Sequence, residues 1–223
     1  MSNKLNLSLK AVIFDLDGTL YPIRQVARNS WLLMCQHPRL FSAFGRARRT
    51  LRGEKPGVDL RHRQAEIVAK LLGIKTAVAA NAVEKIIYQQ WPSTFRRLRP
   101  YYYVPETLTH LRGNGLRLGI ISDSPFARQK LRALGLNDGW NLVVTADEVG
   151  MLKPNPEPFL RVVDDFQIQP KEILFIGNSY SKDIMGAHQV GMRTAHRTRR
   201  KVAAGIAEFS FSNYSSFLKF FSS

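Results

Sequence analysis

The chain has 223 residues, an ordinary hydrophobic content of 44% and a formal net charge of +16. This length and composition suit an α/β domain with an insertion, or two small domains, around a buried core. No apolar run is long enough to span a bilayer, and no apolar signal core precedes Asp15, so we expect a cytoplasmic protein without membrane contact. The single cysteine, Cys35, excludes an internal disulfide, and its apolar neighbours predict a buried thiol on a helix face.

The positive charge is unevenly distributed along the chain. Residues 21–99 hold 16 Lys and Arg against 4 Asp and Glu, whereas the remaining residues hold 17 against 13. Such a split indicates that residues 21–99 form a separate unit with its own surface. We therefore divide the chain into a core domain, residues 1–20 and 100–223, and an inserted domain, residues 21–99.

The predicted elements before residue 100 are one strand and then only helices. A short apolar run predicts a strand at 10–14. Helical spacing follows, with stops at glycines and at Trp91-Pro92, and with Thr76 as an N-cap. It predicts four or five helices, over about 26–34, 40–51, 67–72 and 76–90, with a turn at 53–57.

From Pro100 onward, strands and helices alternate. The strands are predicted at 116–121, 142–145, 173–176 and 193–196, and the helices at 105–112, 125–134, 156–166 and 181–190. This alternation predicts a parallel sheet with right-handed crossovers. Five phenylalanines are expected to pack a last strand and helix onto the core: Phe209, Phe211, Phe217, Phe220 and Phe221. The basic run 197–201 is expected to be a solvated loop.

Two acids, Asp15 and Asp17, stand where the first strand should end. Ligands bind at the carboxyl ends of strands in open α/β sheets. Two carboxylates cannot be buried there without a cation or a proton, so the pair predicts a site. A hairpin turn at Asp17-Gly18 is the alternative, but Leu20-Tyr21-Pro22 does not start an alternating strand.

The stretch Asp15-Leu16-Asp17-Gly18-Thr19-Leu20 resembles the first motif of the haloacid dehalogenase superfamily, most of whose members are Mg²⁺-dependent phosphatases. Ser122, Lys153-Pro154-Asn155-Pro156 and Gly177-Asn178, with Asp183, resemble its second, third and fourth motifs, each after a predicted strand. The resemblance implies a Rossmann-like three-layer α/β core with a parallel sheet, and an inserted all-helical cap that closes over the site.

The resemblance also implies a role for each motif residue. Asp15 would be the nucleophile that forms an aspartyl-phosphate, Asp17 the general acid and base, and Lys153 the cation that stabilises the phosphorylated carboxylate. Gly18 lets the backbone approach the phosphate. Thr19, Ser122 and Asp123 are assigned to substrate binding, although Asp123 would oppose an anion unless its side chain turns away. By itself, Ser122 would be read as a helix N-cap or a turn residue, but its position one strand-helix unit after the insertion favours the motif.

The implied Mg²⁺ ligands are Asp15, Asp17 through its backbone carbonyl, Asn178 and Asp183. The family pattern usually has Asp where this chain has Asn178. An amide oxygen can bind Mg²⁺ but supplies no charge, so we expect a weaker metal site. Asn178-Ser179 could also be only an N-cap pair for the next helix.

We predict a Mg²⁺-dependent phosphatase for a small phosphorylated metabolite. Arg24 and Arg28 follow the first motif and are expected to face the site and favour a polyanionic substrate, while the other arginines of 21–99 lie on a solvated face. Three alternatives remain open: a nucleic-acid-binding or end-processing protein, suggested by the Arg and aromatic residues at 95–103; a catalytically weak phosphate-binding relative; and dehalogenation, which Asp17 argues against. The oligomeric state is left open.

Overall fold

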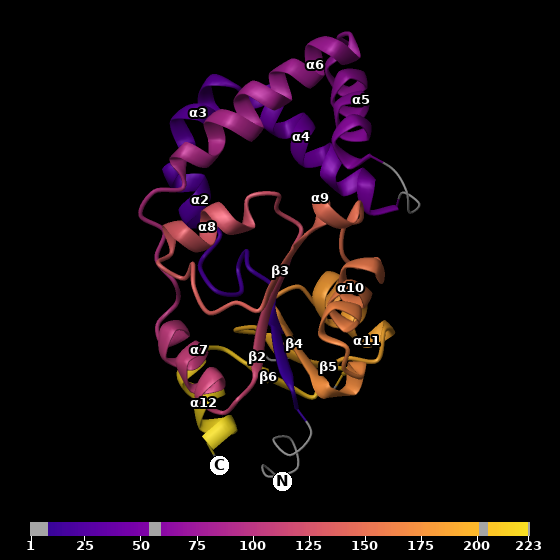
Figure 1. Ribbon diagram of the computed structural model, residues 1–223. Coiled ribbons are helices and arrows are strands. Elements are labelled where there is room, and N and C mark those ends of the chain that lie inside the picture. Colours follow the sequence, from indigo (N-terminus) through magenta and orange to yellow (C-terminus); the bar gives the residue numbers. More distant parts are fainter. Residues whose placement is uncertain (1–8, 54–58, 201–204, 223) are drawn as a thin grey trace.

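Six parallel strands form one sheet at the centre of the computed structural model, which describes residues 9–53, 59–200 and 205–222 (Figure 1). The strands are β1 (Ala11–Phe14), β2 (Arg117–Ser122), β3 (Leu142–Thr145), β4 (Ile173–Gly177), β5 (Arg193–Arg197) and β6 (Phe209–Phe211). Their order is β3-β2-β1-β4-β5-β6. The direction of winding reverses between β1 and β4, and ligands bind at such switch points.

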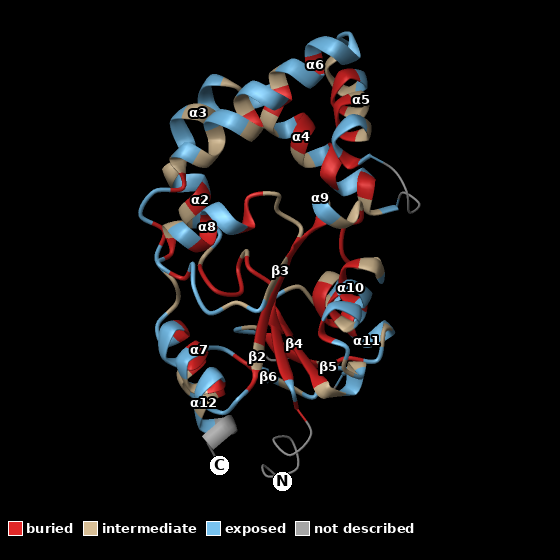
Figure 2. Ribbon diagram, viewed as in Figure 1, coloured by how far each residue is buried: buried red, intermediate tan, exposed pale blue. Residues whose placement is uncertain are grey.

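Helices cover both faces of the sheet, which confirms the predicted three-layer core. Side chains of β1 alternate between the two faces. Val12 and Phe14 pack in the apolar cluster that includes α7 (Val104–Gly113) and α12 (Tyr214–Ser222). Ala11 and Ile13 pack with α10 (Glu157–Phe166) and α11 (Met185–Gln189). The central strands are therefore buried on both sides (Figure 2), as parallel strands usually are.

The end of the chain packs onto the first of these faces. Phe211, Tyr214 and Phe217 are buried there, and Phe209 packs against them. This confirms the predicted last strand and helix for three of the five phenylalanines. Phe220 and Phe221 lie outside the described side chains.

Over residues 21–99 the described chain forms helices and no strand, as predicted. These are α2 (Arg24–Asn29), α3 (Trp31–Gln36), α4 (Pro38–Thr50), the 3-10 helix η1 (Leu51–Gly53), α5 (Leu60–Leu72), α6 (Thr76–Ala82), the π-helix η2 (Val83–Gln90) and the 3-10 helix η3 (Trp91–Thr94). We call these elements the helical insertion. It lies over the carboxyl ends of the strands (Figure 1). Most of the turn predicted at 53–57 lies outside the described residues.

The predicted burial of Cys35 is wrong, because the helix expected at 26–34 is broken at Ser30. Ser30 is buried, and its hydroxyl contacts Thr94 Oγ1 at 2.6 Å and accepts a hydrogen bond from Trp91 Nε1 at 2.9 Å. After this break, α3 turns outward and has no buried residue. Cys35 is exposed, and Trp31 is 58% exposed.

Several helix boundaries also differ from the predicted ones. Lys75, and not Thr76, holds the N-cap position of α6. The helix predicted from Pro125 is α8 (Ala127–Ala133), and the one predicted at 181–190 begins as the π-helix η5 (Tyr180–Ile184) before α11. The short helices α9 (Ala146–Val149) and η4 (Pro170–Glu172) were not predicted, because they are too short to show a periodic pattern. Among the described residues, no helix combines the length and apolar character that a membrane crossing requires.

Candidate active site

Asp15 extends from the end of β1 into a nearly closed environment and is 6% exposed. Its backbone N–H donates to Ile176 O at 2.8 Å, which fixes the start of the loop. Thr19 Oγ1 donates to one carboxylate oxygen and Lys153 Nζ to the other, both at 2.7 Å. Burial raises the pKa of Asp15 to about 7, although the Lys153 ammonium acts in the opposite direction.

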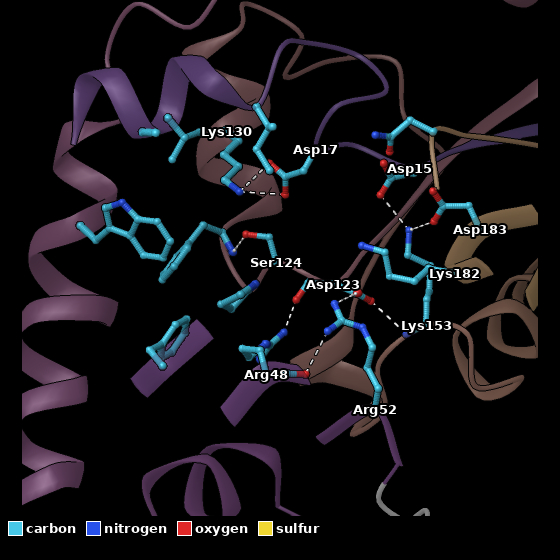
Figure 3. A pocket seen from close by; sticks show the side chains of 18 of the residues that line it. Asp15, Asp17, Arg48, Arg52, Asp123, Ser124, Lys130, Lys153, Lys182 and Asp183 are labelled. Carbon is cyan, nitrogen blue, oxygen red and sulfur yellow. Dashed lines mark hydrogen bonds and ion pairs between the residues drawn. The ribbon is translucent and has the colours of Figure 1, made fainter. Parts of the chain in front are cut away.

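Lys153 bridges two carboxylates, one from the loop after β1 and one from the π-helix η5 (Figure 3). Its Nζ lies 2.7 Å from Asp15 Oδ1 and 2.7 Å from Asp183 Oδ1. Burial alone would lower the pKa of Lys153, but Asp15 and Asp183 raise it above its usual value, so the side chain is an ammonium. A Cβ at Gly177 would overlap the Asp183 side chain, so a glycine is required there for Asp183 to reach the site.

Asp17 is held by two donors that lie on the other side of the site. Lys130 Nζ, from α8, is 2.8 Å and 2.9 Å from the two carboxylate oxygens, and Tyr21 Oη donates to Oδ1. Lys130 is buried, and burial together with Asp17 raises the pKa of Tyr21, so the phenol stays a hydrogen-bond donor. Sequence reasoning missed both partners, because no local pattern marks Lys130 or Tyr21.

The loop after β1 contacts the loop after β4 through Gly18 and Asn178. Gly18 has a φ of +89°, and a Cβ there would lie 2.5 Å from Asn178 Nδ2. Thr19 Oγ1 lies 3.3 Å from Asn178 Oδ1. The structure therefore brings Asn178 to the predicted site, next to Thr19 and close to Asp15.

Ser122 and Asp123 follow β2, but they are placed differently. Ser122 is buried, and its Oγ accepts a hydrogen bond from Ser124 N–H at 3.1 Å. This contact is typical of a turn, the alternative that the sequence left open for Ser122. Asp123 accepts from Lys153 N–H and from Arg52, both at 2.9 Å. Despite burial, Lys153 and Arg52 hold the pKa of Asp123 below its usual value. Arg52 thus neutralises the charge of Asp123, and the Asp123 carboxylate holds the backbone of Lys153 in place.

A cavity of about 370 Å³ opens above these residues, between the sheet and the helical insertion. Asp15, Asp17, Asp123, Lys153, Asn178 and Asp183 line its base. Its walls are mostly apolar: Ile23, Val26, Ala27, Met34, Phe44, Trp91, Pro125 and Phe126. Lys182, from η5, also lines it. The predicted motif residues are therefore together in one pocket, apart from Gly18, Thr19 and Ser122, which do not line it.

Two arginines of the helical insertion reach the cavity, against the expectation of a solvated face. Arg48 NH1 donates to Asp147 Oδ1 at 3.0 Å, and its NH2 donates to Asp123 O. Arg52 pairs with the Asp123 carboxylate (Figure 3). One sequence feature could have indicated the burial of Arg48. It stands four residues after Phe44, which places it on the buried face of α4.

Arg24 and Arg28 do not line this cavity, although Arg24 lines an adjoining hollow with Gly18 and Asn178, so that a direct role at the site stays a prediction. Val26 and Ala27 occupy the face of α2 that lines the cavity. Arg24 and Arg28 also line a further hollow with Arg97. The arginines that do reach the cavity are paired with carboxylates, and therefore add little free positive charge for a polyanionic substrate.

The charges and donors at the base of the cavity fit a divalent cation. Two buried carboxylates, Asp15 and Asp183, share the single Lys153 ammonium, and burial and the nearby Asp183 raise the pKa of Asp15, as expected where two acids share one cation. Carboxylate, amide and carbonyl oxygens are the ligands that Mg²⁺ prefers. Within the described ranges, no three His, Cys, Asp or Glu side chains gather as a metal site.

Known proteins resemble this chain along most of its length. A family model described as a haloacid dehalogenase-like hydrolase matches residues 9–191. A glyceraldehyde 3-phosphate phosphatase of Methanothermobacter thermautotrophicus is 33% identical over 192 residues, which cover 82% of this chain and 83% of the relative. An N-acetylmuramic acid 6-phosphate phosphatase of Pseudomonas aeruginosa is 30% identical over 203 residues, which cover 85% and 81%.

A solved structure also shares the fold. The 2-haloacid dehalogenase from Pseudomonas syringae pv. Tomato DC3000 superposes with a TM-score of 0.71 at 23% identity, and the match covers 96% of this chain and 98% of that one. At this identity the likeness concerns the arrangement of the core and the insertion, not the chemistry.

Proposed function

Because the chain belongs to the haloacid dehalogenase-like hydrolases, we propose that it is a phosphatase that hydrolyses a small phosphomonoester with Asp15 as the nucleophile. One observation carries this proposal: Asp15 is held against the Lys153 ammonium at 2.7 Å, at the base of a cavity that Asp17 also lines. The curated relatives reported above are named as phosphatases of small phosphorylated sugars and trioses.

In the first step, an Asp15 oxygen attacks phosphorus while the bond between phosphorus and the ester oxygen breaks. Lys153 stabilises the negative charge on the carboxylate and the phosphoryl oxygens. Asp17 gives its proton to the leaving oxygen, which departs as an alcohol. Lys130 and Tyr21 hold the Asp17 carboxyl in its orientation.

In the second step, water hydrolyses the aspartyl-phosphate. Asp17 takes a proton from the water, whose oxygen attacks phosphorus, and Asp15 is released as a carboxylate with inorganic phosphate as the product. Asp17 is thereby protonated for the next cycle. A halide leaving group would need no proton, so an acid at Asp17 favours phosphate chemistry over dehalogenation.

We infer that the cation at this site is Mg²⁺, held by the carboxylates of Asp15 and Asp183, the backbone carbonyl of Asp17 and the amide oxygen of Asn178. When bound, Mg²⁺ neutralises negative charge on the phosphoryl oxygens. Asn178 carries no charge, so the remaining carboxylates supply all the negative charge that holds the cation.

The test is a phosphatase assay with p-nitrophenyl phosphate and a panel of phosphometabolites, in Mg²⁺ or in EDTA. We expect Mg²⁺-dependent turnover that Asp15→Asn abolishes. The matched control is Asp165→Asn, which changes an acid on the outer surface of α10, where it pairs with Arg161. If neither the metal nor Asp15 affects phosphate release, the proposed function is wrong.

A further inference from the structure

Seven arginines lie together beside the cavity, and the proposed hydrolysis uses none of them. They come from α2, from the segment before α7 and from the end of β5, and they are Arg24, Arg28, Arg97, Arg99, Arg197, Arg199 and Arg200. We call this surface the arginine track. It consists of two hollows of about 390 and 680 Å³, which share Pro22 and Arg24. In the part of the chain that the structure describes, no Asp or Glu lines either hollow.

Arg197 is held in place in the first hollow, the one of about 390 Å³. It is 8% exposed, and its guanidinium lies 3.7 Å from the centre of the Tyr101 ring. Its NH1 donates to Gly18 O at 3.1 Å, while its buried Nε has no hydrogen-bond partner among the described residues. A guanidinium that is packed and only partly paired is a preorganised site for an anion.

The other six arginines of the track are exposed and carry unneutralised charge. Some arginines elsewhere on the surface are paired, for example Arg128 with Glu148 and Arg161 with Asp165. None of the six forms an ion pair with a described acid, because no carboxylate lies within the hollows. Like charges at this density repel one another, and a ligand with regularly spaced negative charges would relieve that repulsion.

Exposed aromatic residues follow two of these arginines in the chain. Tyr102 is 91% exposed and Tyr103 is 48% exposed, three and four residues after Arg99 and just before the body of α7. Tyr101, the residue before Tyr102, lines the first hollow together with Arg24 and Arg197. Exposed rings beside a positive groove stack on unpaired bases. A chain of phosphates alone would not use these rings.

From this combination we propose that the arginine track binds single-stranded nucleic acid, with the phosphates along the arginines and an unstacked base on Tyr102. A duplex would keep its bases away from the ring. The first hollow and the active-site cavity share Asn178 and Ile23, so the bound strand passes beside the catalytic pocket. Binding needs no turnover, and it holds whether or not the protein is a phosphatase.

The test measures the fluorescence anisotropy of a labelled oligothymidine of about 20 nucleotides, longer than one such site, at several salt concentrations. The full chain is compared with a track variant, Arg24→Gln, Arg28→Gln, Arg97→Gln and Arg99→Gln. A matched control loses the same charge from exposed arginines elsewhere: Arg39→Gln, Arg46→Gln, Arg49→Gln and Arg132→Gln. We expect binding to weaken at least tenfold in the track variant, with the salt slope reduced by about three, since each lost phosphate contact accounts for about 0.7.

A second arm separates nucleic acid from other polyanions. Tyr102→Ala is expected to weaken binding of the oligothymidine about fivefold and to leave binding of an abasic strand of the same length unchanged, because only the first can stack. Equal losses in the track and control variants would assign the binding to net charge. Equal binding of the abasic and thymidine strands would assign it to a general polyanion site. Either result overturns the proposal, and neither bears on Asp15.

Discussion

At the residue scale, the least expected feature is the pairing of Asp17 with Lys130. Lys130 is buried on α8, and its ammonium contacts both oxygens of the residue proposed as acid and base. Removing this contact frees the Asp17 carboxyl to rotate. We expect Lys130→Met, which keeps the length and removes the charge, to lower kcat for phosphomonoester hydrolysis by about tenfold, a fraction of what acid–base catalysis contributes.

A positioning role and a merely structural role for Lys130 predict different results. If Lys130 positions Asp17, KM stays nearly constant while kcat falls, and Lys130→Arg restores most of the rate because a guanidinium also reaches a carboxylate. The control is Arg128→Gln, an exposed change on the same helix. Circular dichroism and thermal melting show whether each variant is folded. A loss that Lys130→Arg does not recover would falsify the positioning role.

The residues that the sequence predicted and those that it missed differ in how they reach the site. Asp15, Lys153, Asn178 and Asp183 each follow a strand of a parallel sheet, so the strand pattern alone places them at one edge. Lys130, Arg48 and Arg52 enter from helices, where position depends on the packing of α8 and the helical insertion against the core. Nothing in the local sequence separates buried Arg48 from exposed Arg49 except the apolar face that Arg48 shares with Phe44.

At the element scale, the short helix α9 connects the helical insertion to the core. Its residue Asp147 accepts from Arg48 at 3.0 Å, from Tyr88 at 3.1 Å and from Arg61 at 3.4 Å, all of them residues of the insertion. Thr145 and Glu148 form a capping box that fixes the start of α9. One carboxylate therefore holds α4, α5 and η2 against the end of β3.

We expect Asp147→Asn to weaken this attachment, because it leaves Arg48, which is 8% exposed, without its counterion. The free energy of unfolding should fall by about 2 kcal/mol, between the values for exposed and buried ion pairs. Backbone amides of α4 and α5 should exchange hydrogen faster than those of the sheet, as measured by hydrogen-exchange mass spectrometry.

The matched control for Asp147 is again Asp165→Asn, an acid paired at the outer surface of α10. It should change neither the exchange of α4 nor the unfolding free energy by more than about 0.5 kcal/mol. Should both variants exchange alike, the attachment through Asp147 would be of no energetic importance. The helices that this carboxylate joins were predicted from their apolar spacing, but α9 was not, because four residues give no period.

At the scale of the whole molecule, the cavity exists only because the core and the helical insertion meet. Val26, Phe44 and Trp91 come from the insertion, and Phe126 comes from the core. The edge-to-face contacts of Trp91 with Phe44 and Phe126 fix this wall. The sequence predicted both parts, but not the wall between them, because its residues are far apart in the chain.

This wall bears on the choice of substrate. An apolar wall that faces the leaving group favours binding of an ester whose alcohol is itself apolar. The gain in binding free energy is about 25 cal/mol for each Å² of apolar surface removed from water. We expect the ratio of kcat/KM for 1-naphthyl phosphate to that for glycerol 2-phosphate to exceed about ten. The intrinsic difference in leaving-group reactivity is removed by comparing the same ratio between variants.

The decisive variant is Trp91→Ala, which removes part of the wall without touching Asp15, Asp17 or Lys153. It should lower kcat/KM for the naphthyl ester about tenfold, equivalent to the loss of one well-packed aromatic contact, and change that for the glycerol ester by less than about twofold. The control, Trp140→Ala, removes an indole that lies outside the cavity and packs edge-to-face on Phe14. A uniform loss with both esters in Trp91→Ala would mean that the wall only supports the fold, and that selection of the leaving group lies elsewhere.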